Sequence, residues 1–152
     1  MTTSARYNHL GHCVRDADAS IRFYTSAFGF TVERDLTVPD VPSDRLLRIP
    51  APIGLRAVYL RLGDEFVLEL LEFADAPVVT PPERVMNEYG LTHLSLSVDD
   101  IAATCSLVEE FGGSILRDTD LGKAIYVRDP DGQLIELLPM SYWDHVEATR
   151  PR

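Results

Sequence analysis

Residues 126–138, Tyr-Val-Arg-Asp-Pro-Asp-Gly-Gln-Leu-Ile-Glu-Leu-Leu, form a pattern of two short strands joined by a tight turn. The turn is residues 129–132, whose Pro and Gly supply the backbone angles that a chain reversal needs. In the second strand, alternation places Glu136 on one face between two leucines. A carboxylate in that setting is costly to bury unless something pairs with it. The stretch therefore predicts a hairpin whose glutamate has a partner.

The same hairpin pattern occurs earlier in the chain, in residues 59–71, and matches without a gap. Tyr, Arg, Asp, Glu, Leu and Leu recur at the same places. Glu69 and Glu136 are therefore equivalent positions of two copies of one unit.

The openings of the two halves also correspond. Residues 8–16, NHLGHCVRD, match residues 92–100, THLSLSVDD, so that His9 corresponds to His93. Each half has the pattern of a strand, a helix and then about three strands, beginning with a histidine and ending with a glutamate. Self-similarity on this scale is first of all a signature of a repeated fold unit.

The segments between these landmarks give further expectations. A helix is expected to begin at one of three possible N-caps, Asp16, Asp18 or Ser20, and to run to about Phe28, where Gly29 closes it. Residues 37–54 contain four prolines and predict a long loop with a short helix at 43–49. A short helical stretch is expected before residue 91. Strands are expected at residues 115–118 and 124–127.

The division of the chain follows from the repeat. We expect a first module at residues 1–76, which includes the loop 37–54, and a second module at 91–139. Residues 77–90 form a linker between them, stiffened by prolines. Residues 140–152 are a C-terminal tail. The two modules together are expected to be a single structural domain, because 152 residues suffice to bury a shared core.

Composition excludes several classes of partner. The formal net charge of −10 repels phosphate backbones, and the sequence has no basic patch, so we expect no nucleic-acid partner. No apolar run reaches membrane-spanning length, and the N-terminus lacks the apolar core of a signal peptide, so no membrane association is expected. Two cysteines outside any Cys-x-x-Cys motif fit a reduced, cytoplasmic protein.

Several of these motifs together resemble the vicinal oxygen chelate superfamily, which includes glyoxalase I, methylmalonyl-CoA epimerase, extradiol dioxygenases and bleomycin-resistance proteins. The resemblance lies in His9 followed by Asp16, in the aromatic residues around Gly29, and in Asp-Pro-Asp-Gly-x-x-x-Glu136. It covers the chain from Tyr7 to Pro139. The implied fold is α+β, with two tandem βαβββ modules whose curved, mixed and partly open sheets enclose a metal-binding cavity.

The resemblance also implies a metal site with one ligand from each of four strands. Carried over residue by residue, the ligands are His9, Glu69, His93 and Glu136. Two imidazoles and two carboxylates without a thiolate suit one divalent ion of intermediate hardness, such as Ni, Co, Zn, Fe or Mn. Taken alone, either histidine would more often be structural, and the repeated set is what favours a metal.

The chemistry implied by this site is proton transfer next to a carbonyl of a small-molecule substrate. A cation that chelates two vicinal substrate oxygens stabilises an enediolate as it forms. We therefore expect a lyase, isomerase or epimerase, with Glu136 as the first choice of base and Glu69 as the second. The alternatives are an extradiol-type dioxygenase and a non-catalytic protein that sequesters an antibiotic.

Two positions expected to bind substrate depart from the glutathione-using members of the family. Bacterial glyoxalases of that type place an arginine where this chain has Cys13 and an asparagine where it has Phe73. Both positions help hold the glutathione peptide, so their change weakens the case for glutathione. A homodimer is expected, and the sequence leaves open whether the two modules complete the site within one chain or with a partner chain.

Overall fold

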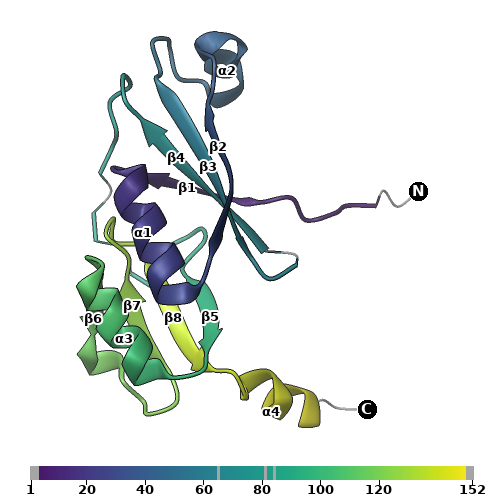
Figure 1. The fold of residues 1–152 in the computed structure, drawn as a ribbon, viewed down its shortest axis with the longest axis vertical. Coiled ribbons are helices and arrows are strands. Elements are labelled where there is room, and N and C mark those ends of the chain that lie inside the picture. The colour runs from purple at the N-terminus through teal and green to yellow at the C-terminus, as the bar shows by residue number, and fades with distance from the viewer. Residues whose placement is uncertain (1–3, 65, 81, 84, 150–152) are drawn as a thin grey trace. The chain divides into compact units, whose positions relative to one another are not determined.

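The computed structural model describes residues 4–64, 66–80, 82–83 and 85–149. These residues form two compact units, one with the described residues up to Thr25 and Gly29–Thr80, the other with Ser26–Phe28 and the described residues beyond Thr80. Each unit contains one four-stranded mixed sheet (Figure 1). The expected α+β fold with two βαβββ modules is thus confirmed. The module boundaries at residues 76 and 91 stay predictions.

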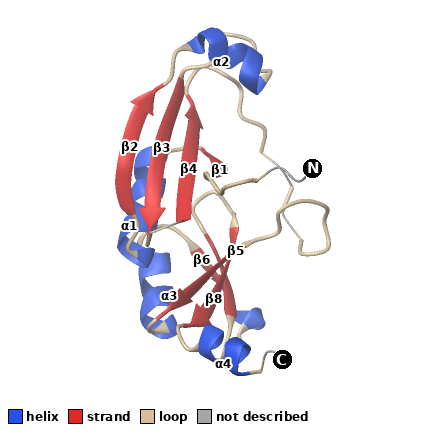
Figure 2. Ribbon diagram, turned by 90° about the vertical axis from the view of Figure 1, so that its right-hand side faces the viewer, coloured by secondary structure: helices blue, strands red, loops and turns tan. Residues whose placement is uncertain are grey.

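The first module follows the order strand, helix, strand, helix, strand, strand. Its sheet has the order β1-β4-β3-β2, in which β1 and β4 are parallel and the other pairs antiparallel. Figure 2 shows β2, β3 and β4 side by side. The elements are β1 (Leu10–Val14), α1 (Ala17–Phe28), β2 (Thr31–Thr37), α2 (Asp40–Leu47), β3 (Leu55–Leu62) and β4 (Phe66–Phe73).

Helix α1 begins and ends where the sequence predicts. The Asp16 carboxylate accepts a hydrogen bond from the backbone N–H of Ala19 at 2.8 Å, which satisfies a free donor of the first turn. Gly29 ends the helix in the left-handed conformation, with φ of 72°. Tyr24 is buried and its ring lies 6.4 Å from that of His12. His12 is thus directed toward the helix, on the opposite sheet face from His9.

The proline-rich segment 37–54 is anchored to the sheet by its own small core. The side chain of Asp40, at the start of α2, accepts hydrogen bonds from the backbone of Ile53 and Gly54. Helix α2 spans Asp40–Leu47, but Val41 and Pro42 have non-helical backbone angles, so its regular part lies within the expected residues 43–49 and ends two residues earlier. The residues of this core are Ile53, Leu55 and Ala76, with Val38, Leu47, Ile49, Leu71 and Phe73 packed against them.

The second module repeats the topology of the first. Its sheet has the order β5-β8-β7-β6, with β5 and β8 parallel. Helix α3 starts after its N-cap, Asp100, and lies against β6, β7 and β8. The elements are β5 (Leu94–Val98), α3 (Ile101–Glu110), β6 (Ser114–Leu116), a 3-10 helix (Arg117–Thr119), β7 (Ile125–Arg128), β8 (Leu134–Pro139) and α4 (Tyr142–Ala148).

Two local expectations for the second module were wrong. The strand expected at residues 115–118 ends at Leu116, because the Thr119 hydroxyl donates to the carbonyl of Leu116 at 2.7 Å and closes a turn there. The described residues between 82 and 90 form turns and bends instead of a helix. In both segments, a local turn formed by polar residues or glycine determines the backbone conformation, and the spacing of the apolar residues does not.

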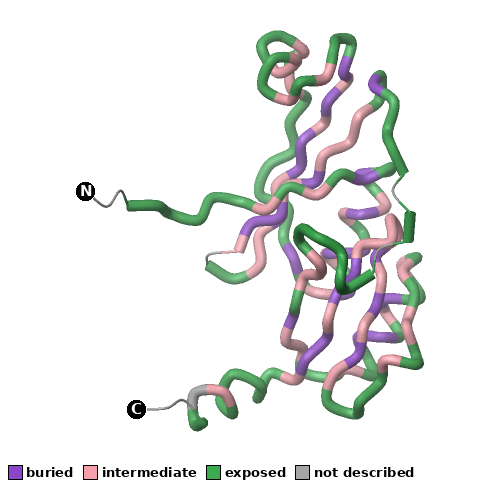
Figure 3. The backbone as a smooth tube through the Cα atoms, turned by 180° about the vertical axis from the view of Figure 1, so that it is seen from behind, coloured by how far each residue is buried: buried purple, intermediate pink, exposed green. Residues whose placement is uncertain are grey.

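Burial in the first module is greatest in β3 and β4, whereas β2 is exposed along its length. In Figure 3, buried and partly buried positions follow β3 and β4, whereas the segment before β1 is exposed along most of its length. Over the described ranges, we find no helix that combines the length and the apolar character needed to cross a membrane.

Candidate functional site

The first module brings together His9 and Glu69. His9 lies just before β1, and Glu69 lies in the middle of β4, the parallel neighbour of β1. The His9 Nε2 and Glu69 Oε2 atoms are 3.0 Å apart. The Glu69 side chain is 12% exposed, so a neutral sheet face surrounds most of its carboxylate. A charge in such a setting needs a nearby cation or donor.

The second module brings together the equivalent residues. His93 precedes β5, and Glu136 lies on β8, the parallel neighbour of β5. Their Nε2 and Oε2 atoms are 3.5 Å apart, and both side chains are about one quarter exposed, at 25% and 23%. Each module thus presents one histidine and one glutamate from two adjacent parallel strands.

The residue before each histidine contacts the Nδ1 atom of the imidazole ring. His9 Nδ1 lies 2.6 Å from the Asn8 Oδ1 atom, and His93 Nδ1 lies 2.9 Å from the Thr92 hydroxyl. An amide oxygen can only accept, so Nδ1 of His9 is the donor in this contact, and Nε2 is the ring nitrogen directed toward Glu69. Such contacts fix the tautomer and orientation of a metal-binding imidazole.

Two tyrosines that the sequence analysis did not assign to the site also belong to it. The Tyr59 hydroxyl donates to the Glu69 carboxylate, which, together with burial, raises the pKa of Tyr59 to about 12. The Tyr126 hydroxyl lies 3.4 Å from Glu136 Oε1, and burial and the charge of Glu136 raise its pKa. Both rings also make edge-to-face contacts with the histidine of their module, at 5.8 and 5.4 Å.

A signal for these tyrosines is present in the sequence. Tyr59 and Tyr126 open the two gapless hairpins, and each is the register partner of the glutamate on the next strand. Register partners on one face lie side by side, so a tyrosine repeated at this place can reach the carboxylate in both modules.

The two glutamates differ in one respect. Ser95 is the register partner of Glu136 on β5, and its hydroxyl donates to Glu136 Oε2 at 2.8 Å. The corresponding partner of Glu69 is Gly11, which has no side chain. The carboxylate of Glu136 is therefore held by two hydroxyl groups, whereas the strand next to Glu69 leaves space beside the carboxylate.

The donor set fits a divalent cation. Two ligands bound about 2.1 Å from one ion are roughly 3.0 Å apart at a right angle and roughly 3.4 Å apart at a tetrahedral angle. The separations of 3.0 and 3.5 Å suit neighbouring ligands of one ion. Within the described ranges, no three or more His, Cys, Asp or Glu side chains form a cluster that could hold a metal. Each module thus supplies a pair, and four ligands require both pairs.

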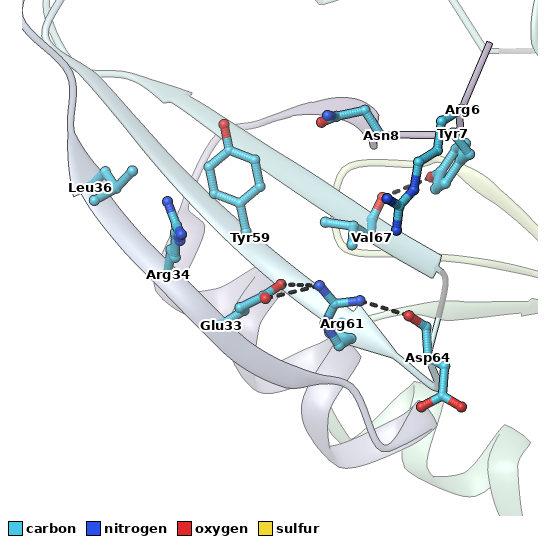
Figure 4. A pocket seen from close by; sticks show the side chains of 10 residues that line it. All are labelled: Arg6, Tyr7, Asn8, Glu33, Arg34, Leu36, Tyr59, Arg61, Asp64 and Val67. Atoms are coloured by element: carbon cyan, nitrogen blue, oxygen red, sulfur yellow. Dashed lines mark hydrogen bonds and ion pairs between the residues drawn. The ribbon is translucent and has the colours of Figure 1, made fainter. Parts of the chain in front are cut away.

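A pocket of about 690 Å³ lies on the first module, on the same sheet face as Tyr59 (Figure 4). Its shape depends on a β-bulge in β2, where Val32 pairs with Leu60 and Arg34 pairs with Tyr59, so that Glu33 is an extra residue. The pocket is lined by Arg6, Tyr7, Asn8, Glu33, Arg34, Leu36, Tyr59, Arg61, Asp64 and Val67.

The two positions expected to bind substrate, Cys13 and Phe73, are not among the residues that line this pocket. Cys13 is exposed on β1. Phe73 is packed against the apolar core that anchors segment 37–54, and no residue of that segment lines the pocket. A role for Cys13 and Phe73 in substrate binding stays a prediction.

Comparison with known proteins agrees with this architecture. The model of the Glyoxalase/Bleomycin resistance protein/Dioxygenase superfamily matches residues 6–137. The chain is 31% identical over 130 residues to a probable lactoylglutathione lyase of Vibrio cholerae, a match that covers 82% of this chain and 83% of that protein.

Two solved structures share the fold. The trypanothione-dependent glyoxalase I of Leishmania major has a TM-score of 0.68 at 28% identity, and the match covers 95% of this chain and 94% of that one. A glyoxalase family protein from Bacillus cereus has a TM-score of 0.79 at 19% identity, covering 91% and 95% of the two chains. The family match spans both modules and both histidine–glutamate pairs. The chain belongs to the Glyoxalase/Bleomycin resistance protein/Dioxygenase superfamily.

Proposed function

We propose that the protein is a divalent-metal-dependent enzyme that moves a proton next to a carbonyl group of a small molecule, as a lyase, isomerase or epimerase. The observation that carries this proposal is the repeated pair: a histidine and a glutamate at 3.0 and 3.5 Å, each with an orienting neighbour and a tyrosine. A relative named probable lactoylglutathione lyase supports the class of reaction.

The metal would be held by His9, Glu69, His93 and Glu136, with the two pairs contributed by one chain or by two. This set suits Ni, Co, Zn, Fe or Mn. When bound, such a cation supplies Lewis acidity, which favours negative charge on a substrate oxygen. Asn8 and Thr92 orient the imidazoles, so that each Nε2 is directed toward the glutamate of its module.

The proton is taken from the substrate carbon by a glutamate. We assign this role first to Glu136 and second to Glu69. Ser95 and Tyr126 fix the Glu136 carboxylate from two sides, so its oxygens need little reorganisation to face a substrate carbon. Tyr59 and His9 contact Glu69, which then acts as a ligand.

Glu136→Gln tests the assignment, because it keeps the shape and an oxygen donor but removes the charge and most of the basicity. The readout is exchange between solvent and the substrate carbon, followed by NMR with 2-oxo aldehyde thiol adducts and 2-methyl-branched acyl thioesters. Loss of a general base costs about 10²–10⁴-fold in rate. We expect that loss in Glu136→Gln, with fold and metal content retained, and no loss in Glu110→Gln, an exposed control on α3.

Wild-type exchange that persists at full rate in Glu136→Gln would remove Glu136 from the mechanism. If Glu69→Gln lowers the exchange rate more than Glu136→Gln does, Glu69 is the base and Glu136 acts as a ligand. No exchange with any compound, together with tight binding of an aromatic antibiotic, would favour a sequestering protein. Oxygen-dependent cleavage of a catechol would favour the dioxygenase.

A further inference from the structure

The pocket on the first module is lined by three arginines, Arg6, Arg34 and Arg61, and by two acidic residues, Glu33 and Asp64. In the part of the chain that the structure describes, the side chains of Arg6 and Arg34 form no ion pair or hydrogen bond. Arg61, the third arginine of the pocket, is different, because both oxygens of Glu33 accept from its guanidinium at 2.8 and 2.7 Å. Three arginines against two carboxylates make this pocket locally positive, although the chain as a whole has a net charge of −10.

Arg34 is held in the pocket by the backbone of β2. Without the bulge at Glu33, strand alternation would place Glu33 and Arg34 on opposite faces. With the bulge, Glu33 pairs with Arg61 and Arg34 lies beside its register partner Tyr59. Figure 4 shows Arg34 on one side of Tyr59 and Arg6 on the other. The positive charge of Arg34 also acts on both Glu33 and Tyr59.

One row of register partners links Arg34 to the histidine–glutamate pair. Arg34 is opposite Tyr59, Tyr59 is opposite Glu69, and Glu69 is opposite Gly11. Adjacent strands are about 4.8 Å apart, so the backbone positions of Arg34 and Glu69 are separated by roughly 10 Å. Both side chains are long, so a group bound to Arg34 would be only a few bonds away from one held at Glu69.

We propose that this pocket binds the anionic group of a compact substrate, a carboxylate or a phosphate, through Arg34 with Arg6 as a second cation. The guanidinium of arginine matches the paired oxygens of both groups, and the Asn8 amide and the Tyr59 hydroxyl supply further polar contacts. The inference rests on the proposed function for the position of the reacting carbon. It places the anionic group on the β2 side of the sheet, away from Cys13 and Phe73.

The volume and the asymmetry of the repeat agree with a small charged ligand. About 690 Å³ is within the range of small-molecule pockets. Tyr126 is the repeat equivalent of Tyr59, and its register partner on β6 is the apolar Leu116, where Tyr59 has Arg34. The repeat therefore supplies this cation in the first module only, so the site is not a by-product of the duplicated fold.

NMR titration of the full-length, isotope-labelled protein tests the proposal. The probes are inorganic phosphate, succinate as a carboxylate, and succinamide as its uncharged analogue. Each titration is made with the protein as purified and again after treatment with a chelator. A probe that binds to a metal ion instead of to the arginines loses its effect after the chelator treatment. We expect phosphate or succinate, but not succinamide, to shift the signals of Arg34, Tyr59 and Arg61. The responding probe identifies the anionic group.

Arg34→Gln should weaken that binding about tenfold to a hundredfold, the usual effect of losing a charge-assisted hydrogen bond. Arg34→Lys should recover part of the affinity. Arg45→Gln removes the same charge from exposed helix α2 and should leave the affinity unchanged. Equal weakening by Arg45→Gln, unchanged affinity in Arg34→Gln, or equal binding of succinamide would overturn the proposal. Arg34-dependent binding in a protein without exchange activity would support this subsite and contradict the proposed function.

Discussion

At the scale of single residues, the environments of the two glutamates distinguish them. Glu136 accepts from Ser95 at 2.8 Å and has a longer contact, 3.4 Å, with the Tyr126 hydroxyl. Glu69 accepts from Tyr59 and faces Gly11 on the neighbouring strand. Glu69 therefore has one hydroxyl donor, Tyr59, in addition to its contact with His9, whereas Glu136 has two hydroxyl donors in addition to His93.

This difference predicts unequal effects of removing the two tyrosine hydroxyls. Loss of a group that orients a metal ligand lowers metal affinity about 10–100-fold. We expect Tyr59→Phe to show an effect in this range and Tyr126→Phe a smaller one, because Ser95 still holds Glu136. Metal affinity is measured by competition with a chromophoric chelator. Tyr142→Phe, on helix α4, is the control.

Equal losses in Tyr59→Phe and Tyr142→Phe would show that the Tyr59 hydroxyl does not orient a ligand. A larger loss in Tyr126→Phe would contradict the role given to Ser95.

The sequence predicted which residues pair within each module, but not the residues around them. A repeat identifies equivalent positions, and parallel pairing of the first and last strands then brings His9 beside Glu69. The contact from Asn8 depends on a ring rotamer, and the access of Arg34 to the pocket depends on a bulge. Neither the ring rotamer nor the bulge produces a repeating sequence pattern from which it could be predicted.

At the scale of elements, the anchoring of segment 37–54 depends on one glycine. Gly54 has φ of 62°, and a Cβ at this position would be 2.6 Å from a carboxylate oxygen of Asp75 and 3.0 Å from its backbone nitrogen. Gly63, in the turn between β3 and β4, also has φ of 62°, but a Cβ there would have nothing within 4 Å. The two glycines share a backbone conformation and differ in the space around them.

Alanine substitution at these two glycines separates backbone strain from crowding. Gly63→Ala should lower the free energy of unfolding by about 1–2 kcal/mol, the cost of the left-handed conformation for a residue with a Cβ. Gly54→Ala should lower it by a further ~1–3 kcal/mol, because its close neighbours include backbone. Urea denaturation measures both values. Equal destabilisation of the two variants would mean that Asp75 moves away without cost.

The limits of α1 were the most predictable local features, because a single residue determines each end. Asp16 and Asp100 cap α1 and α3, and Gly29 closes α1. The prediction was less accurate where a short-range hydrogen bond ends an element. Strand β6 is cut short by the Thr119 hydroxyl, which also accepts from the backbone of Tyr126. No secondary structure was predicted for the tail, where α4 forms.

At the scale of the whole molecule, the proposed function depends on an arrangement larger than either module. Each module has one histidine beside one glutamate, and the proposed four-ligand site would take one such pair from each module. The expected homodimer and the choice between one chain and two stay predictions. Two separate half-sites would bind cations weakly, because two ligands leave most of the coordination shell to water.

Elemental analysis after equilibration with Ni, Co, Zn, Fe or Mn and removal of excess ion tests this claim most directly. It compares the wild type with His9→Gln, His93→Gln and a control, His145→Gln, on exposed helix α4. We predict one tightly held ion per chain in the wild type and in His145→Gln, and almost none in either of the other two variants. Two ions per chain that fall to one in His9→Gln and in His93→Gln, or no tightly held ion in the wild type, would contradict a site shared by the two modules.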